Sequence, residues 1–292
     1  MSGSWVVGVD LGGTKIALGL VDPQDKIVAR KRILMRDCDD CPPVVVQQIA
    51  EAVAGFGQLL PAGEHISALG ICSPGPLDHV TGTLIDPPNL PGFHHTPIRQ
   101  MLEDALQLPV SLEHDAKAAA LGEYYFGSGR GAASMVYVVV GTGVGAAIIV
   151  NGELFRGTSN TAGEVGHITL DRDGELCSCG SRGCVETYIS GPWISRRYQR
   201  AAEEAELLSA GDVMPSCTAI TALAEQGDPL ALRIMTKAGE ALGVAVASMA
   251  MLLDVELYII GGGVAHAGEL LLAPANNAVS SCSGVRRLAA AI

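Results

Sequence analysis

Residues 5–21 read WVVGVDLGGTKIALGLV, and this stretch decides the fold. Residues 5–10 form an apolar run typical of a buried strand, residues 11–14 form a glycine turn, and residues 15–21 form a second strand. A third strand is expected over residues 26–34. Backbone N–H groups in glycine turns bind phosphate, and a carboxylate at the end of the preceding strand suits Mg²⁺. The stretch therefore indicates either an anion-binding turn or an ordinary hairpin.

The arrangement of strand, glycine turn and strand recurs about 130 residues later. Residues 135–140 predict a strand, residues 141–143 a glycine turn, and residues 144–150 a second strand that ends in a hairpin turn at Asn151-Gly152. A third glycine turn, Gly261-Gly262-Gly263, follows another short strand. The recurrence favours an internal duplication, with two unrelated hairpins as the alternative.

Helices and further short strands complete an α/β chain. The length of 292 residues suits two domains, and we place them at residues 1–116 and 117–292. Asp228-Pro229 provides an N-cap and a first-turn proline for the longest helix, and Thr96-Pro97 predicts the same for a shorter one. The other helices are expected over residues 43–60, 116–126, 191–209 and 216–226, and the longest over 229–253.

Composition and charge exclude several classes of protein. No apolar run reaches the ~18 residues that a membrane-spanning helix needs, and the first residues, MSGSWVVGVD, do not form a secretory signal. Acidic residues outnumber basic ones by 31 to 19, and a net charge of −12 argues against non-specific binding to nucleic acid. We therefore expect a cytoplasmic protein with neither a nucleic-acid nor a membrane partner.

Eight cysteines are present, and a reducing compartment makes disulfides a poor explanation for them. Cys177, Cys179 and Cys184 lie close together, with intervening glycines that let the loop fold back, and His167 precedes them. Three thiolates and one imidazole are a common tetrahedral set for Zn²⁺, and a site closed by four protein ligands is structural. Free buried thiols are the alternative. The pair Cys38-x-x-Cys41 has no nearby ligands and is interpreted as incidental.

These motifs together resemble the ROK family of sugar kinases and repressors, and within it the bacterial glucokinases. The most specific are GEVGH at residues 163–167 and CSCGSRGCVE at residues 177–186, supported by DLGGTK at residues 10–15 and NLPGF at residues 89–93. Neither a Walker phosphate loop nor a GxGxxG turn that opens a helix is present in the sequence. The resemblance implies a two-domain actin-like ATPase fold, which is ribonuclease H-like, with duplicated βββαβαβα-type domains and a cleft between them.

The resemblance also implies a reaction, in which ATP with Mg²⁺ phosphorylates a hexose, preferably glucose, at its C6 hydroxyl. Asp115 would be the general base, although its position between a short strand and a helix suits an N-cap equally well. The implied sugar-binding residues are Gly75, Asn89, His114, Asp115, Glu164, His167 and Glu186, with a solvated loop charge as the alternative for the two glutamates. The implied nucleotide-binding residues are Asp10, Gly12, Gly13, Thr14 and Lys15 in the first turn, Gly141, Thr142 and Gly143 in the second, and Gly261, Gly262 and Gly263 in the third.

The chain departs from the family pattern at three places. His114 stands where the family usually has Asn before the catalytic Asp; an imidazole can also donate or accept a hydrogen bond, but it is larger, and it could bond to Asp115. Lys117, where the family often has a second Asn, is expected to point to solvent. The family usually ends in a further strand and a helix that returns to the first domain, whereas residues 280–292 depart from that pattern.

Other functions share part of this evidence. An N-acetylmannosamine or N-acetylglucosamine kinase would carry the same motifs. A sugar-responsive repressor would need an N-terminal helix-turn-helix, and the four residues that precede Trp5 leave no room for one. A catalytically inactive paralogue is disfavoured because Asp10, Asp115 and the glycine turns are all present. The resemblance further implies a homodimer or a homotetramer.

Overall fold

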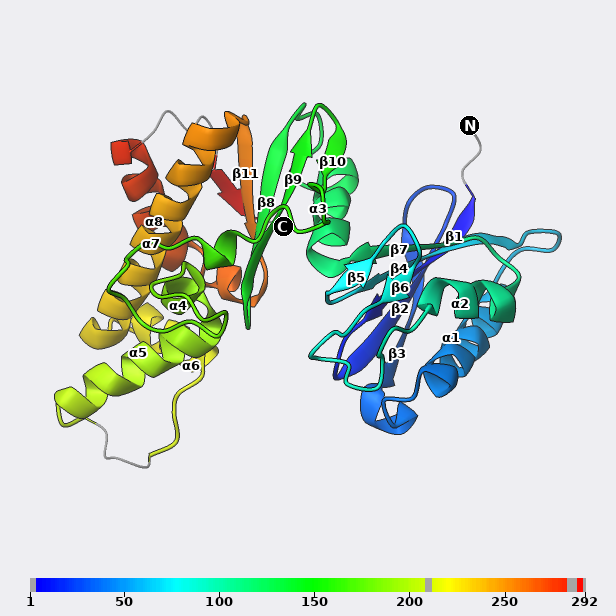
Figure 1. The fold of residues 1–292 in the computed structure, drawn as a ribbon, viewed down its shortest axis with the longest axis horizontal. Coiled ribbons are helices and arrows are strands. Elements are labelled where there is room, and N and C mark those ends of the chain that lie inside the picture. The colour runs from blue at the N-terminus through cyan, green and yellow to red at the C-terminus, as the bar shows by residue number, and fades with distance from the viewer. Residues whose placement is uncertain (1–3, 208–211, 283–287, 291–292) are drawn as a thin grey trace. The chain divides into compact units, whose positions relative to one another are not determined.

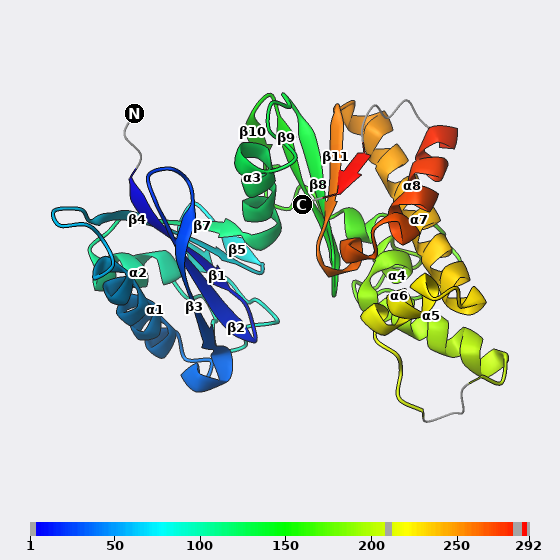
Figure 2. The same ribbon diagram turned by 180° about the vertical axis from the view of Figure 1, so that it is seen from behind.

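The computed structural model describes residues 4–207, 212–282 and 288–290. The chain divides into two compact units, Met1–Ala118 and Ala119–Ile292. The division falls inside helix α3 (Asp115–Phe126), whose first turn belongs to the first unit. Each unit is built on one five-stranded sheet with helices packed against it (Figures 1 and 2).

The sheet of the first unit has the strand order β3-β2-β1-β4-β7. β1, β2 and β3 form an antiparallel meander, whereas β4 and β7 continue the sheet parallel to β1. Parallel strands end at the same edge of a sheet, so the carboxyl ends of β1, β4 and β7 are neighbours. The strands are β1 (Trp5–Leu11), β2 (Lys15–Val21), β3 (Ile27–Leu34), β4 (Ile66–Ser73) and β7 (Val110–His114).

Helices α1 (Pro42–Gly57) and α2 (Ile98–Leu106) cover one face of this sheet (Figure 1). Ile49 of α1 and Leu102 of α2 pack in one apolar cluster with alternate residues of β1. Asp10 alternates with those residues and lies outside the cluster, because successive side chains of a strand point to opposite faces. The smaller elements are η1 (Met35–Cys38), β5 (Leu77–Asp78) and β6 (Thr83–Leu84).

The second unit repeats this topology. Its sheet has the order β10-β9-β8-β11-β12, again an antiparallel meander extended by two parallel strands. The same order of pairing in both sheets confirms the internal duplication that the glycine turns indicated. The strands are β8 (Met135–Val140), β9 (Val144–Val150), β10 (Glu153–Phe155), β11 (Leu257–Gly261) and β12 (Leu288–Ala290).

Helices cover both faces of the second sheet. Ala120 of α3 packs on one face with Met135 and Tyr137. The helices that follow the cysteine loop at residues 177–184 pack on the other face with Val136 and Val138 (Figures 1 and 2). Alternate residues of β8 thus face opposite helical layers. The helices of the second layer are α4 (Glu186–Ile189), α5 (Gly191–Glu204), α6 (Cys217–Glu225), α7 (Pro229–Leu253) and α8 (Glu269–Cys282), with the shorter η2 (Val165–His167) and η3 (Gly263–Ala267) beside them.

Helix α7 is the one described helix that is long and apolar enough to cross a membrane by length and composition alone. Its Met235, Leu242 and Val246 are fully buried in the main core cluster of the second unit. The Asp228 side chain accepts a hydrogen bond from the Ala231 N–H at 2.7 Å, which confirms the predicted N-cap. The packing is that of a core helix, which explains its apolar composition.

The structure corrects two expectations. Thr96 does not cap a helix, because its backbone pairs with Leu84 and its hydroxyl donates to the His94 carbonyl; α2 begins after Pro97. Lys117 is buried, with 3% of its surface exposed, rather than solvated.

The expected helix over residues 191–209 ends at Glu204, and its residues 208–209 lie outside the described part of the chain. The further strand that the family usually has is present as β12, parallel to β11. Of the tail at 280–292, residues 283–287 and 291–292 likewise lie outside the description.

Candidate active site and metal centre

The carboxyl ends of three parallel strands bring together three predicted site residues of the first unit, Asp10, His114 and Asp115. The register places Asp10 of β1 opposite Cys72 of β4, and Ser73 of β4 opposite His114 of β7. Asp115 follows immediately as the first residue of α3. Ligands of open α/β sheets bind outside the carboxyl ends of the strands, so this edge is the expected place for a reactive carboxylate.

One carboxylate oxygen of Asp115 is held by two donors. Oδ1 accepts a hydrogen bond from the Ala116 backbone N–H at 2.6 Å, and Nδ1 of His114 lies 2.9 Å from the same oxygen. An ionised carboxylate only accepts hydrogen bonds, so this contact assigns a proton to Nδ1. The two contacts fix the carboxyl group and leave Oδ2 for a substrate. Asp115 is the first residue of α3, and its bond to the adjacent Ala116 N–H differs from an N-cap bond, which reaches the second or third N–H of a helix.

The other ring nitrogen of His114 faces the loop after β4. A Cβ atom on Gly75 would lie 3.0 Å from Cδ2 and 3.1 Å from Nε2 of His114. A larger residue at position 75 would therefore press on the imidazole. With the proton on Nδ1, the Nε2 atom is a hydrogen-bond acceptor. The ring thus presents a hydrogen-bond acceptor on the side of the Gly75 loop.

Asp10 lies close to a second negative charge. Partial burial, followed by the charge of Asp115, raises the pKa of the Asp10 carboxyl, while Lys15 and the neighbouring thiol of Cys72 lower it. The Sγ atom of Cys72 lies 3.8 Å from Oδ1 of Asp10. Burial and the two carboxylates raise the pKa of Cys72 to about 12, so it is a neutral thiol that donates to Asp10. Two neighbouring carboxylates, of which Asp10 has the raised pKa, suit a divalent cation.

The first glycine turn contacts the loop that was predicted to bind sugar. A Cβ on Gly13 would lie 2.2 Å from the backbone carbonyl oxygen of Asn89, so only glycine permits this approach. The Gly12 N–H donates to the Lys15 carbonyl at 3.0 Å, which closes the turn. Thr14 and Lys15 are exposed. The structure therefore joins the turn at 12–15 to Asn89, although the two are far apart in the sequence.

The predicted metal ligands converge in the second unit. One ligand atom from each of four residues lies within 4.8 Å of all the others, namely those of His167, Cys177, Cys179 and Cys184. The Sγ atoms of Cys179 and Cys184 are 3.7 Å apart, and Sγ of Cys177 is 3.7 Å from Nδ1 of His167. Zn–S bonds of about 2.3 Å in a tetrahedron give ligand separations of about 3.8 Å. The four residues therefore fit Zn²⁺, with Nδ1 as the histidine ligand.

The thiols of this cluster differ in environment. The backbone N–H of Ser181 and neighbouring thiols lower the pKa of the exposed Cys179 to about 7. Burial and the neighbouring thiols raise the pKa of Cys184 to about 12. The seven cysteines whose side chains are described form no disulfide, as the sequence predicted.

The two glutamates beside this cluster reach different places. Gly163 packs its Cα against the Ala146 carbonyl, to which a Cβ would come within 1.9 Å, and this close approach fixes the exposed Glu164 beside β9. Glu186, the first residue of α4, turns towards the second glycine turn, where its Oε2 accepts a hydrogen bond from the Val144 N–H at 3.0 Å. One of its carboxylate oxygens is thus engaged within the unit, and Glu186 is not simply a solvated loop charge.

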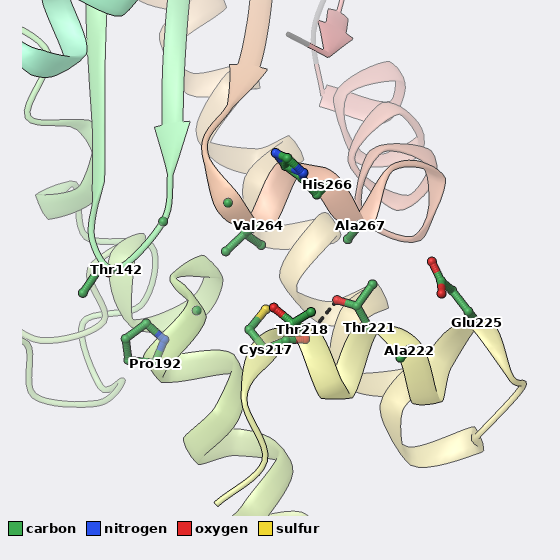
Figure 3. A pocket seen from close by; sticks show the side chains of 13 residues that line it. Thr142, Pro192, Cys217, Thr218, Thr221, Ala222, Glu225, Val264, His266 and Ala267 are labelled. Atoms are coloured by element: carbon green, nitrogen blue, oxygen red, sulfur yellow. Dashed lines mark hydrogen bonds between the residues drawn. The ribbon is translucent and has the colours of Figure 1, made fainter. Parts of the chain in front are cut away.

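The second and third glycine turns line one cavity of about 550 Å³ (Figure 3). Gly141 and Thr142 form one end, and Gly263 of η3 borders it, whereas Gly261 and Gly262 face away onto β8. Helix α6 forms the opposite wall. The α6 residues that line the cavity belong to no sequence motif, because the helix is short and most of its side chains are small. Those residues are Cys217, Thr218, Thr221, Ala222 and Glu225.

Comparison with known proteins identifies the family. The ROK family profile matches residues 6–283, and the chain belongs to the ROK family. A glucokinase from Streptomyces coelicolor is 37% identical over 276 residues, which cover 92% of this chain and 84% of the relative. An N-acetylmannosamine kinase from Yersinia pestis is 33% identical over 266 residues, which cover 88% of this chain and 82% of the relative.

A solved structure supports the same assignment. The ROK family glucokinase from Streptomyces griseus, in complex with glucose and AMPPNP, is 35% identical, with a TM-score of 0.79, and the match covers 99% of this chain and 94% of that one. Together with the two duplicated sheets, this similarity confirms the predicted actin-like ATPase fold.

Proposed function

We propose that this chain is a sugar kinase that transfers the γ-phosphoryl group of ATP to the C6 hydroxyl of glucose. The observation that carries the proposal is the fixed carboxylate of Asp115, whose Oδ1 is held by His114 and Ala116 while Oδ2 is left for a substrate. The similarity to glucokinases along most of the chain supports glucose as the hexose.

In this proposal Asp115 is the general base. Its Oδ2 takes the proton of the sugar hydroxyl while the hydroxyl oxygen bonds to the γ-phosphorus. The bond from that phosphorus to the bridging oxygen breaks, and its electron pair leaves with ADP. His114 keeps the carboxylate in one orientation, so that Oδ2 rather than Oδ1 meets the hydroxyl. Most of the catalysis in such a transfer comes from positioning and charge stabilisation.

The phosphate groups are assigned to the glycine turns. Backbone N–H groups of such turns bind anions without a basic side chain, which is consistent with the net charge of −12. Mg²⁺, when bound, neutralises phosphate charge, and the Asp10 carboxylate offers it an oxygen ligand. We assign phosphate contacts to Gly12, Gly13, Thr14 and Lys15 of the first unit and to Gly141, Thr142 and Gly143 of the second, and the adenosine to the turn at Gly261, Gly262 and Gly263.

We assign the binding of the sugar to polar groups from each of the two units. Carboxylates and amides bind pairs of ring hydroxyls. The Nε2 atom of His114 can accept from a further hydroxyl, because its Nδ1 carries the proton. The Nε2 atom of His167 would carry the proton when Nδ1 binds Zn²⁺, so it would donate to a hydroxyl. We assign sugar contacts to Gly75, Asn89 and His114 of the first unit and to Glu164, His167 and Glu186 of the second.

Zn²⁺ has a structural role in this proposal. His167, Cys177, Cys179 and Cys184 would fill all four positions of a tetrahedral ion, which leaves none for a substrate or water. The ion would hold the loop that carries His167 and Glu186. Its effect on catalysis would therefore come through the geometry of these residues.

A coupled assay tests the proposal, with ADP release measured for glucose, mannose, N-acetylmannosamine and N-acetylglucosamine under identical conditions. The expected result is a kcat/KM for glucose well above those for the N-acetyl sugars. Asp115→Asn is the matched inactive control. Absence of sugar-dependent ADP release from all four sugars would overturn the proposal.

An amino-sugar kinase is the second candidate. The N-acetylmannosamine kinase relative supports it, and the motifs of the two kinds of kinase are shared. A higher kcat/KM for N-acetylmannosamine than for glucose in the same assay would favour this candidate. We further propose a cytoplasmic homodimer or homotetramer, and light scattering measures its mass.

A further inference from the structure

The cavity between α6 and η3 has two chemically different ends. At one end lie the backbone of Gly141 and the Thr142 turn; at the other, Figure 3 shows Glu225 on the far side of the cavity from Thr142. Between them, Ala222 lies on the α6 side and Val264 on the η3 side, and Thr221 and His266 add polar groups to the lining. A flat ring fits between such walls, with a phosphate-bearing group at the glycine turn.

Helix α6 brings its polar groups to the cavity at helical spacing. Thr218, Thr221 and Glu225 follow one another at three and four residues, so they lie on one face of the helix. The Thr221 hydroxyl donates to the Cys217 carbonyl at 3.0 Å, as the dashed line in Figure 3 shows, so its oxygen is left as an acceptor. The far end of the cavity therefore presents acceptors to a ligand.

The position of Glu225 is unfavourable for the helix itself. It is the last residue of α6, where the negative end of the helix dipole disfavours an acidic side chain. Among the described residues, no hydrogen bond or ion pair engages its carboxylate. A residue that breaks a local rule without a compensating contact is a candidate for ligand binding.

We propose that Glu225 recognises the purine base of the nucleotide, and that its carboxylate accepts a hydrogen bond from the exocyclic amino group of adenine. This inference rests on the proposed use of ATP and adds the residue that selects it. A base with an oxo group at C6 would place an acceptor against the carboxylate and would be rejected. Glu225 is thus a specificity-determining residue of the phosphoryl donor site.

Three nucleotides that differ at C6 of the base distinguish a hydrogen bond to the Glu225 carboxylate from repulsion by it. ATP has the amino group, purine riboside triphosphate has only hydrogen at C6, and inosine triphosphate has an oxo group. The wild type should show the highest kcat/KM for ATP, about tenfold or more above the value for purine riboside triphosphate, with inosine triphosphate lowest. In Glu225→Ala, the ratio of ATP to purine riboside triphosphate should fall to about one.

A matched control is Glu153→Ala, which removes an exposed carboxylate from β10 of the same unit. It should keep the three-nucleotide ranking of the wild type. Equal nucleotide ratios in Glu225→Ala and the wild type would overturn the role of Glu225, and so would a preference of the wild type for inosine triphosphate.

Measurement of nucleotide binding without sugar tests the role of Glu225 separately from the proposed sugar kinase activity. Calorimetric titration of each nucleotide without sugar measures base recognition even in a protein that transfers no phosphate. If ATP binds and Glu225→Ala weakens it about tenfold while purine riboside triphosphate is unaffected, the inference stands whatever the sugar. If none of the three nucleotides binds, both the inference and the proposed function fail.

Discussion

His114 Nδ1 lies 2.9 Å from Oδ1 of Asp115, the same oxygen that accepts the Ala116 N–H. The carboxylate is therefore fixed through one oxygen and free at the other. The side chains of His114 and Asp115 are 29% and 46% exposed, so a substrate can reach both. This pair distinguishes the chain from the usual ROK pattern, in which asparagine precedes the catalytic aspartate.

Asp115→Asn should abolish turnover without harming the fold. The amide oxygen can still accept the Ala116 N–H, but the amide cannot take a proton from a hydroxyl. We expect kcat to fall by at least about 100-fold, while Tm and glucose binding change little. Steady-state kinetics and thermal denaturation measure this. The exposed Asp104→Asn on α2 is the control, and near-normal activity of Asp115→Asn would refute the assignment of the base.

His114→Ala should impair catalysis through the orientation of Asp115. Loss of one of the two donors to Oδ1 frees the carboxylate to rotate, and we expect kcat to fall about tenfold. His114→Asn restores the residue type usual in the family and should recover most of the activity. Separate kcat and KM values for the two variants provide the measurement. Equal losses in both variants would argue that the position serves packing rather than orientation.

Asp10→Asn should raise stability at neutral pH while it lowers activity. Burial and the Asp115 charge raise the folded-state pKa of Asp10, so its ionised form is less favourable in the folded protein than in the unfolded one. The stabilisation of the variant should be complete above the folded-state pKa and disappear as the pH falls through it. Urea unfolding of both proteins from pH 7 downward measures the difference. A variant less stable than the wild type at pH 7 would contradict the electrostatic account.

Cys184→Ser should remove the metal. Elemental analysis should find about one zinc per wild-type chain and none in the variant, and Tm should fall by several degrees, because bound metal contributes to folding free energy. Cys41→Ser changes a half-buried thiol outside the cluster and should keep its zinc. A chelator should lower the Tm of the wild type but not that of Cys184→Ser. Full zinc content in Cys184→Ser would refute the site.

Gly13→Ala should disturb the phosphate turn and the Asn89 loop together. Its Cβ would meet the Asn89 carbonyl oxygen at 2.2 Å, so the loop must move, at a cost of about 1–3 kcal/mol. We expect KM to rise for both ATP and glucose. Gly55→Ala is the control, because nothing lies within 4 Å of its Cβ in α1 and the substitution should stabilise the helix by up to about 1 kcal/mol. Unchanged KM values in Gly13→Ala would contradict the coupling of the two loops.

Much of this protein is determined by local sequence. Alternating apolar residues on β1 and β2 form one buried face. In each unit a glycine turn joins the first strand of the sheet to the second. Asp228 caps α7. The Cys177–Cys184 loop and His167 also form a recognisable ligand set. These features depend on the pleat of a strand, the free N–H groups of a helix start and the chemistry of thiolates, all of which act over a few residues.

The tertiary structure decided what distant residues do together. Strand register, rather than any motif, brings Asp10, Cys72 and His114 to one edge, and the Gly13 contact brings Asn89 to the phosphate turn. The cavity beside Glu225 exists only because α6 packs across from η3. Such contacts depend on the packing of whole elements, so the sequence determined which groups are available, and the fold determined which of them meet.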